Sequence, residues 1–285
     1  MSATGGWTEW VGRKASRTDW VNPNHVAQLL AVLDRDEPFP RAGDPVPPAF
    51  HWTLFTPLAR QSEIGVDGHP RRGGFLPPVP LPRRMWAGSR VRFVAPIRVG
   101  EAVEQISVID RVEEKHGKAG SLVFVTVRHA VSGPAGLAVE EEQDIVYREA
   151  PPPTAANASP QPVEVAPAGE FRSEIRPDPV RLFRYSALTF NGHRIHYDRP
   201  YATGEEGYPG LVVHGPLLAT LLLDLARRQF PDRGIERFRF KAVRATFDVS
   251  PFHVVGARGD EAGALRLWST DNRGQIGVEA EAQLR

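Results

Sequence analysis

The sequence contains no cysteine among its 285 residues. Without a thiol, the chain cannot form disulfides, thiolate zinc sites or iron–sulfur clusters, and it cannot use a cysteine nucleophile. It also lacks an excess of either charge, because 35 Lys and Arg residues stand against 34 Asp and Glu residues. We therefore expect no nucleic acid and no membrane surface as a partner selected by bulk electrostatics.

Long apolar runs are absent too. The most apolar stretch, residues 211–226, is interrupted by polar residues and a Gly-Pro pair, so it is too short and too polar to cross a bilayer. The first six residues lack the basic start and apolar run of a secretory signal. These absences predict a soluble, cytoplasmic protein.

Proline is abundant, and six of the 27 prolines lie between Ala150 and Glu170 among small residues. Such a stretch cannot bury enough apolar surface to offset its ordering entropy, so it predicts a linker. The expected organisation is an N-terminal domain over 1–149, a linker over 150–170 and a C-terminal domain over 171–285. Two parts of similar length suggest an internal duplication.

Each half shows a helix followed by strands that glycine-rich turns separate. In the N-terminal half, Asn22 and Pro23 can begin a helix that carries Val26, Leu29 and Leu33. In the C-terminal half, a leucine-rich helix is expected over 216–228. The expected strands span 90–97, 102–112, 120–131, 141–147, 236–249, 253–257, 264–270 and 275–284. One long helix packed on a curled antiparallel sheet, twice over, is an α+β plan.

A proline-rich run over 75–82 has two interpretations. It can present a polyproline helix to a partner domain. The preferred interpretation is a long loop held against the fold.

The densest cluster of functional side chains lies at 190–200, and His214-Gly215-Pro216 follows it at the start of the leucine-rich helix. A histidine such as His196 can act as general base or acid near neutral pH. The first N–H groups of a helix are free, so Gly215 can polarise a carbonyl oxygen that gains charge. The Asn191 amide can hold water but cannot accept a proton as a carboxylate does.

These motifs resemble those of the MaoC-like (R)-specific enoyl-thioester hydratases and dehydratases. The resemblance rests on the run from Asn191 to Asp198, on Val-Val-His-Gly before Pro216, and in the N-terminal half on Asp67-Gly-His-Pro and the residues 75–88 and 141–147. It implies a double hot-dog fold, two antiparallel sheets that each wrap a central helix, with a degenerate N-terminal hot dog. It further implies reversible addition of water to a trans-2-enoyl-CoA.

By position, the resemblance makes His196 the catalytic histidine and Gly215 the donor to the thioester oxygen. Asn191 stands where many members carry an aspartate, and His193 and Arg194 replace the usual Asn-Pro. These departures are similar to the subgroup that acts on mesaconyl-C4-CoA and itaconyl-CoA, and to mitochondrial type 2 dehydratases. The implied mechanism gives both proton transfers to His196, with Asn191 holding the water.

A dicarboxylic substrate needs a cation for its distal carboxylate. The candidates Arg83, Arg84, Arg194 and Arg199 lie in or near the matching motifs, and His193 is a further candidate contact. The expected substrate carrier is CoA or an acyl carrier protein, and the expected assembly is a monomer with an internal pseudo-dimer or a homodimer.

We expect neither a cofactor nor a metal. A metal interpretation would gather His193, His196 and Asp198 with Asp67 and His69, but the sequence cannot show that these ligands converge. Three further functions stay open: a (3R)-hydroxyacyl-ACP or -CoA dehydratase, an acyl-thioesterase that would use Asp224, and a non-catalytic acyl-thioester-binding protein.

Overall fold

The computed structural model describes residues 6–117, 120–149 and 166–285. Short 3-10 turns lie at Thr8–Trp10, Phe50–Thr53, Gln61–Glu63 and Arg194–His196, and a π turn lies at Tyr201–Glu205. The N-terminal half consists of β1 (Lys14–Trp20), α1 (Pro23–Val32), β2 (Arg83–Phe93), β3 (Ala102–Gly117), β4 (Gly120–Gly133) and β5 (Gly136–Arg148). The C-terminal half consists of β6 (Phe171–Ile175), α2 (Pro179–Leu188), α3 (Gly215–Gln229), β7 (Ile235–Ala242), β8 (Phe252–Arg258), β9 (Ala264–Thr270) and β10 (Ile276–Leu284).

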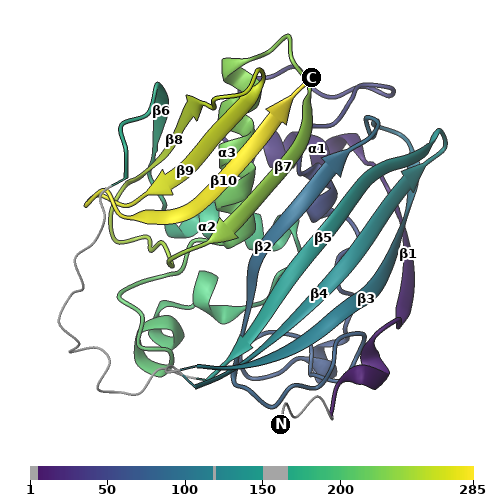
Figure 1. The fold of residues 1–285 in the computed structure, drawn as a ribbon, viewed down its shortest axis with the longest axis vertical. Helices are drawn as coiled ribbons and strands as arrows, with labels where there is room; N and C mark the ends of the chain where they lie inside the picture. Colours follow the sequence, from purple (N-terminus) through teal and green to yellow (C-terminus); the bar gives the residue numbers. More distant parts are fainter. Residues whose placement is uncertain (1–5, 118–119, 150–165) are drawn as a thin grey trace.

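All ten strands form one antiparallel sheet, in the order β1-β3-β4-β5-β2-β7-β10-β9-β8-β6 (Figure 1). Strands β2 and β7 join the two halves, with Val91 opposite Phe238. Gly88 lies at this junction, where an added Cβ would stand 2.3 Å from the carbonyl oxygen of Phe240. The two halves therefore meet through backbone pairing that a larger residue at position 88 would disturb.

Helix α3 is the central element of the C-terminal half. Ten consecutive residues of this helix, 217–226, are buried, and β7 to β10 curl around it (Figure 1). A helix whose buried residues are mostly apolar has to be enclosed, and the sheet provides that enclosure. The double hot-dog prediction is thereby confirmed for the C-terminal half.

The N-terminal half lacks a long central helix among its described residues. Its helix α1, ten residues long, instead contacts α2 of the other half. Residues 34–82 between α1 and β2 form irregular backbone and two 3-10 turns. Because Phe50 and Leu54 from this segment belong to the same hydrophobic core as α3, one core extends through both halves. The prediction that this hot dog is degenerate holds, whereas the prediction of one long helix in each half was wrong.

Several strand boundaries differ from the expected ones. Strand β2 begins at Arg83 rather than Arg90, and β7 ends at Ala242, so residues 244–249 are not a strand. That segment runs along residues 211–213 through backbone hydrogen bonds such as Val213 N to Thr246 O, 2.8 Å. The domain boundaries stay a prediction, because most of the linker lies outside the described residues. None of the described helices is long and apolar enough to span a membrane.

Candidate active site

The N-terminus of α3 forms the floor of the site. Its N-cap is His214, whose side chain makes no capping hydrogen bond, and Gly215 and Pro216 open the helix. An added Cβ at Gly215 would meet no atom within 4 Å, so open space adjoins this residue. Free N–H groups at a helix start attract an oxygen that carries negative charge. The expected role of Gly215 is therefore compatible with its surroundings.

His196 lies directly against this helix start. Its side chain is 7% exposed, and its ring stacks on the ring of His214 with 3.7 Å between centroids. The Nδ1–H group of His196 donates to the carbonyl oxygen of Val212 at 2.7 Å. This bond fixes the tautomer and leaves Nε2 with a free lone pair. Burial lowers the pKa of His196 to about 4, against the opposing effect of the Val212 carbonyl, so the ring is neutral at pH 7.

Asn191 and His193 lie in the turn that follows α2. The Asn191 Oδ1 atom accepts the backbone N–H of His193 at 3.0 Å, which leaves the amide NH₂ group as a donor. The His193 ring meets the His196 ring edge-on at 5.3 Å between centroids. Burial is the main cause that lowers the pKa of His193 far below its ordinary value. Asn191 can thus donate to an oxygen atom through its NH₂ group, while its Oδ1 atom keeps the turn in place through the His193 N–H.

A loop from the N-terminal half, residues 65–72, packs directly on the 191–198 segment. Gly68 has φ +89°, and an added Cβ would stand 1.8 Å from the carbonyl oxygen of Gly192. The Arg194 N–H donates to the Asp67 carbonyl oxygen at 2.9 Å, and Arg194 also donates to the Val66 carbonyl oxygen at 3.0 Å. Only glycine at position 68 allows this approach. The two halves therefore share one site.

The 65–72 loop brings Asp67 and His69 to the histidines. Asp67 Oδ2 accepts from His69 Nδ1 at 3.0 Å, and Asp67 Oδ1 accepts the backbone N–H of His69 at 3.0 Å. The His69 ring lies 4.0 Å from the His193 ring between centroids. From the sequence, these two residues are part of the family resemblance, and the only function considered for them is that of metal ligands. Their Asp-x-His spacing suits a hydrogen-bonded pair, but nothing local shows that the pair faces the 191–198 segment.

Three of the four candidate arginines are already paired with carboxylates. Arg83 pairs with Glu206 at 3.1 Å and Arg194 with Asp198 at 2.8 Å. Arg199 is paired as well, with Asp248 at 2.5 Å. These ion pairs brace the loops around the site and give the three arginines structural roles.

Arg84 differs, because it has no carboxylate partner within the described part of the chain. Burial raises the pKa of the Tyr147 hydroxyl, and the positive charge of the nearby Arg84 guanidinium opposes that rise. Burial lowers the pKa of His69, and Arg84 and Arg72 lower it further, against the opposing effect of Asp67. Arg84 is therefore an unneutralised cation beside the histidines.

Asp67, His69 and His193 place ligand atoms within 4.8 Å of one another, close enough to consider a metal ion. The charges around them oppose this interpretation. Arg72 and Arg84 are near enough to His69 to lower its pKa, and the same two charges would repel a divalent cation. The surroundings suit an anion better than a cation.

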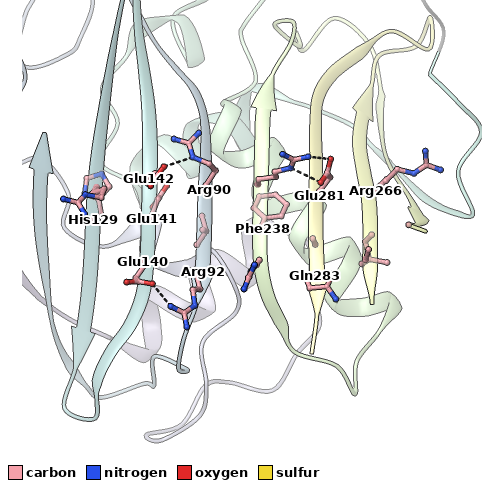
Figure 2. Close-up of a pocket in the computed structure, with 18 of the residues that line it drawn as sticks. Arg90, Arg92, His129, Glu140, Glu141, Glu142, Phe238, Arg266, Glu281 and Gln283 are labelled. Atoms are coloured by element: carbon pink, nitrogen blue, oxygen red, sulfur yellow. Dashed lines mark hydrogen bonds and ion pairs between the residues drawn. The ribbon is translucent and has the colours of Figure 1, made fainter. Parts of the chain in front are cut away.

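A separate groove of about 1070 Å³ lies on strands of both halves, and the four histidines of the site, His69, His193, His196 and His214, are not among its lining residues (Figure 2). Its charged side chains pair across neighbouring strands, as Arg90 does with Glu142 at 2.8 Å and Arg92 with Glu140 at 3.0 Å. A ligand would have to compete with these pairs. The site with unpaired functional groups is the one at the start of α3.

Known proteins that are similar to this chain in sequence or in fold include hydratases and dehydratases. The chain is 48% identical over 250 residues to a mesaconyl-C(4)-CoA hydratase of Chloroflexus aurantiacus, an alignment that covers 87% of this chain and 88% of the relative. A MaoC-like dehydratase from Phytophthora capsici superposes with a TM-score of 0.69 at 14% identity, over 96% of this chain and 95% of that chain.

A Mycobacterium tuberculosis protein described as a double hot-dog fold superposes with a TM-score of 0.55 at 12% identity, over 96% of each chain. At these identities the two structures show the fold alone, and they confirm the double hot dog. The model of the hydroxyacyl-thioester dehydratase type 2 family matches residues 49–248, a range that includes the 65–72 loop, the histidine segment and α3. The chain belongs to the hydroxyacyl-thioester dehydratase type 2 family.

Proposed function

We propose that the protein is a hydro-lyase that adds water reversibly to the C2=C3 bond of an enoyl-CoA, and that its substrate is the branched dicarboxylic mesaconyl-C4-CoA. The observation that carries the chemistry is the tautomer of His196, whose Nε2 is free beside the start of α3. The 48% identity to a relative of that name supports the choice of substrate.

In the hydration direction, the thioester oxygen accepts the Gly215 N–H, which stabilises the negative charge that develops on this oxygen. His196 Nε2 removes a proton from water while the water oxygen attacks C3. The Asn191 amide donates to the attacking oxygen and orients it. C2 then takes up a proton, and every step uses only groups of this chain and water.

Arg84 is the cation that we assign to the distal carboxylate of the substrate. It is the one candidate arginine without a carboxylate partner in the described ranges, and a planar guanidinium binds a carboxylate through two hydrogen bonds. A monocarboxylic acyl thioester such as crotonyl-CoA lacks this group, so Arg84 should favour the dicarboxylic substrate.

A thioesterase is less compatible with the site. The carboxylate available on α3, Asp224, is 4% exposed and binds Arg35 at 2.7 Å, Arg227 at 2.8 Å and Arg228 at 3.1 Å. It stands nine residues beyond Gly215, which corresponds to about 14 Å along the helix. Asp224 therefore stabilises the far end of α3 and cannot act on a thioester at its start.

The same groups carry the reverse reaction, dehydration of a 3-hydroxyacyl thioester, which is the activity in the family description. The thiol that carries the acyl group can be that of CoA or that of an acyl carrier protein. A monomer suffices for the site, because the two halves already supply an internal pseudo-dimer, and a homodimer is equally compatible with it.

The test follows the enoyl absorbance of mesaconyl-C4-CoA and crotonyl-CoA with wild-type protein and with His196→Ala. We expect rapid hydration of mesaconyl-C4-CoA by the wild type and a rate about 100- to 1000-fold lower in the variant. Release of CoA instead of water addition would identify a thioesterase. Binding without either change would identify an acyl-thioester-binding protein.

Arg84→Gln tests the substrate. It should raise KM for mesaconyl-C4-CoA by about 10- to 100-fold, as expected for loss of a charge-assisted pair, and leave KM for crotonyl-CoA unchanged. Arg92→Gln on the outer face is the matched control and should change neither value. Equal effects of Arg84→Gln on both thioesters would contradict the assignment.

A further inference from the structure

The proposed reaction requires a proton to leave water and a proton to reach C2. The 191–198 segment offers two imidazoles for these transfers, His196 and His193, but within the described residues neither has a hydrogen-bonded carboxylate that would stabilise its charged form. Asn191 cannot carry the other proton, because a side-chain amide is not basic enough to accept one near neutral pH. His196 also has no carboxylate to stabilise its charged form, since its Nδ1 faces the Val212 carbonyl. A proton carrier that a carboxylate supports therefore has to come from outside this segment.

The 65–72 loop contributes a group of this kind. Asp67 accepts from His69 Nδ1 at 3.0 Å, so His69 keeps a free Nε2, and the carboxylate stabilises the imidazolium that forms when this atom takes a proton. A second hydrogen bond, from the His69 backbone N–H to Asp67 Oδ1, fixes the carboxylate relative to the ring. The pair has the arrangement that acid–base catalysts use, a base oriented by a buried or half-buried carboxylate.

The loop is held on the site and does not merely pass near it. Gly68 and Gly192 approach closely enough that an added Cβ on either would stand within 3 Å of the other's carbonyl oxygen. The Arg194 N–H bonds the Asp67 carbonyl oxygen, and His69 contacts the ring of His193, which in turn contacts His196. Three imidazole rings from the two halves of the chain therefore form one continuous row.

We propose that His69, oriented by Asp67, is the second acid–base group of the reaction and exchanges the proton at C2, so that the N-terminal half supplies the carboxylate that the C-terminal motif lacks. This inference rests on the proposed function. In hydration, the water O–H bond breaks, the proton goes to His196 Nε2, and the oxygen bonds to C3. The C2=C3 π electrons move to the thioester oxygen as an enolate, which then takes its C2 proton from His69 Nε2.

One proton is thus conserved over the turnover. His69 is an imidazolium at the start of hydration and neutral at its end, and His196 changes in the opposite sense. The His193 ring between them gives a path for the proton to return. The groups that face His69 are Asp67, His193, Arg72 and Arg84. A substrate carboxylate beside Arg84 adds negative charge near His69 and so favours the protonated form of its ring. Binding of an anionic substrate therefore promotes formation of the imidazolium that donates the proton to C2.

Kinetics of His69→Gln test the role, with His253→Gln on β8 as the matched control. We expect kcat for mesaconyl-C4-CoA to fall by about 100- to 1000-fold in His69→Gln with KM within a few-fold of wild type, and one limb of the pH profile of kcat to disappear. Asp67→Asn should lower kcat less, by about 10-fold or more. Retention of kcat within threefold in His69→Gln, with the wild type active, would overturn the proposal.

A binding measurement separates this proposal from the proposed function. Succinyl-CoA is a saturated dicarboxylic thioester that cannot be hydrated, so its binding can be followed in weak buffer without turnover. We expect the wild type and His253→Gln to take up protons on binding it and His69→Gln to take up none. Proton uptake by a wild type that hydrates nothing would retain His69 as the proton carrier and reject the hydratase. Absence of uptake by the wild type would reject the carrier.

Discussion

The two halves of the chain build the same five-stranded unit but fill its inner face differently. The strand orders β1-β3-β4-β5-β2 and β6-β8-β9-β10-β7 correspond strand by strand, and α1 follows β1 as α2 follows β6. Only the C-terminal half then continues into a long buried helix, α3. The N-terminal half has the irregular segment 34–82 in that place, and Phe50 from the 3-10 turn Phe50–Thr53 belongs to the same hydrophobic core as α3.

Because of this difference, the two halves contribute different groups to the site. Helix α3 supplies a rigid, buried helix start at which Gly215 and His196 meet. The irregular segment is not committed to a helix, and its 65–72 loop can reach the other half, where Gly68 contacts Gly192. The half without a central helix thus contributes groups that the half with one lacks, namely Asp67, His69 and Arg84.

The largest expected effect on stability concerns Glu141, which holds the segment that takes the place of a central helix in the N-terminal half. Glu141 is 4% exposed and accepts from Ser89 Oγ at 2.6 Å, Trp52 Nε1 at 3.0 Å and His51 Nε2 at 3.1 Å. Burial raises the pKa of Glu141, but these contacts, above all the one to His51, outweigh it and hold the pKa below its ordinary value. Glu141→Ala leaves the buried donors of His51 and Ser89 and the partly buried donor of Trp52 without this partner, and it should lower the free energy of unfolding by about 3–5 kcal/mol.

Glu142→Ala is the control, because the adjacent residue on β5 points to the outer face and pairs there with Arg90. Its effect on urea unfolding should be below about 1 kcal/mol, as for other exposed ion pairs. If the two variants lose similar stability, the hydrogen bonds of Glu141 do not hold segment 34–82 against the inner face of the N-terminal half. The N-terminal half would then have no substitute for the packing that α3 provides in the C-terminal half.

The second-largest expected effect is a loss of folding stability at acid pH, caused by the buried histidines of the site. Burial lowers the pKa of His69, His193, His196 and His214 from the ordinary 6.5, in His196 to about 4. Below pH 6.5 the unfolded chain therefore binds more protons than the folded one, so stability is full above 6.5 and falls as the pH approaches 4. For His196 alone this amounts to about 3 kcal/mol over the whole range.

Urea unfolding at pH 7.5 and at pH 5 measures this loss. The loss attributable to His196 between these values is about 2 kcal/mol, so His196→Gln should show a smaller difference than the wild type by that amount. Glu141 loses its contribution only below its ordinary value of 4.5, because its pKa is lowered in the folded state. A wild type that is equally stable at both pH values would contradict the burial of neutral imidazole rings.

Local sequence patterns predict the central helix and the hairpins of this fold better than its edge strands and the shorter helix α2. The leucines of 217–225 identify α3, and glycines at the turns identify the hairpins of β3, β4 and β5. The charged strands Lys14–Trp20 and Phe171–Ile175 were missed, because edge strands with few apolar residues show weak alternation. Helix α2 was missed although Asp178 caps it and Pro179 opens it, since exposed Val180 and Phe183 obscure its apolar face.

The site divides in the same way. Asn191 and His196 lie in one motif, and Gly215 lies in a second motif that follows it closely in the chain, so a short stretch of sequence indicates all three. The position of Asp67 and His69 depends on a contact between residues more than 120 positions apart, and no local spacing encodes it. The same holds for Arg84, because only the ion pairs of Arg83, Arg194 and Arg199 set it apart from the other candidates.

The smallest expected change, Gly68→Ala, tests the contact between the halves itself. The new methyl group would stand 1.8 Å from the Gly192 carbonyl oxygen, and alanine disfavours φ +89°, so the loop has to move. We expect the free energy of unfolding to fall by about 1–2 kcal/mol. Hydration of mesaconyl-C4-CoA should slow by about 10- to 100-fold, because a displacement near 1 Å suffices for such a loss.

Gly74→Ala is the matched control in the same segment, since an added Cβ there meets no atom within 4 Å and its φ is not in the left-handed region. It should retain wild-type rates and stability. A Gly68→Ala variant that loses stability but keeps its rate would mean that the 65–72 loop only covers the site. If Gly68→Ala slows hydration by 10-fold or more while it remains folded, and Gly74→Ala does not, the chemistry depends on where the N-terminal half places Asp67 and His69.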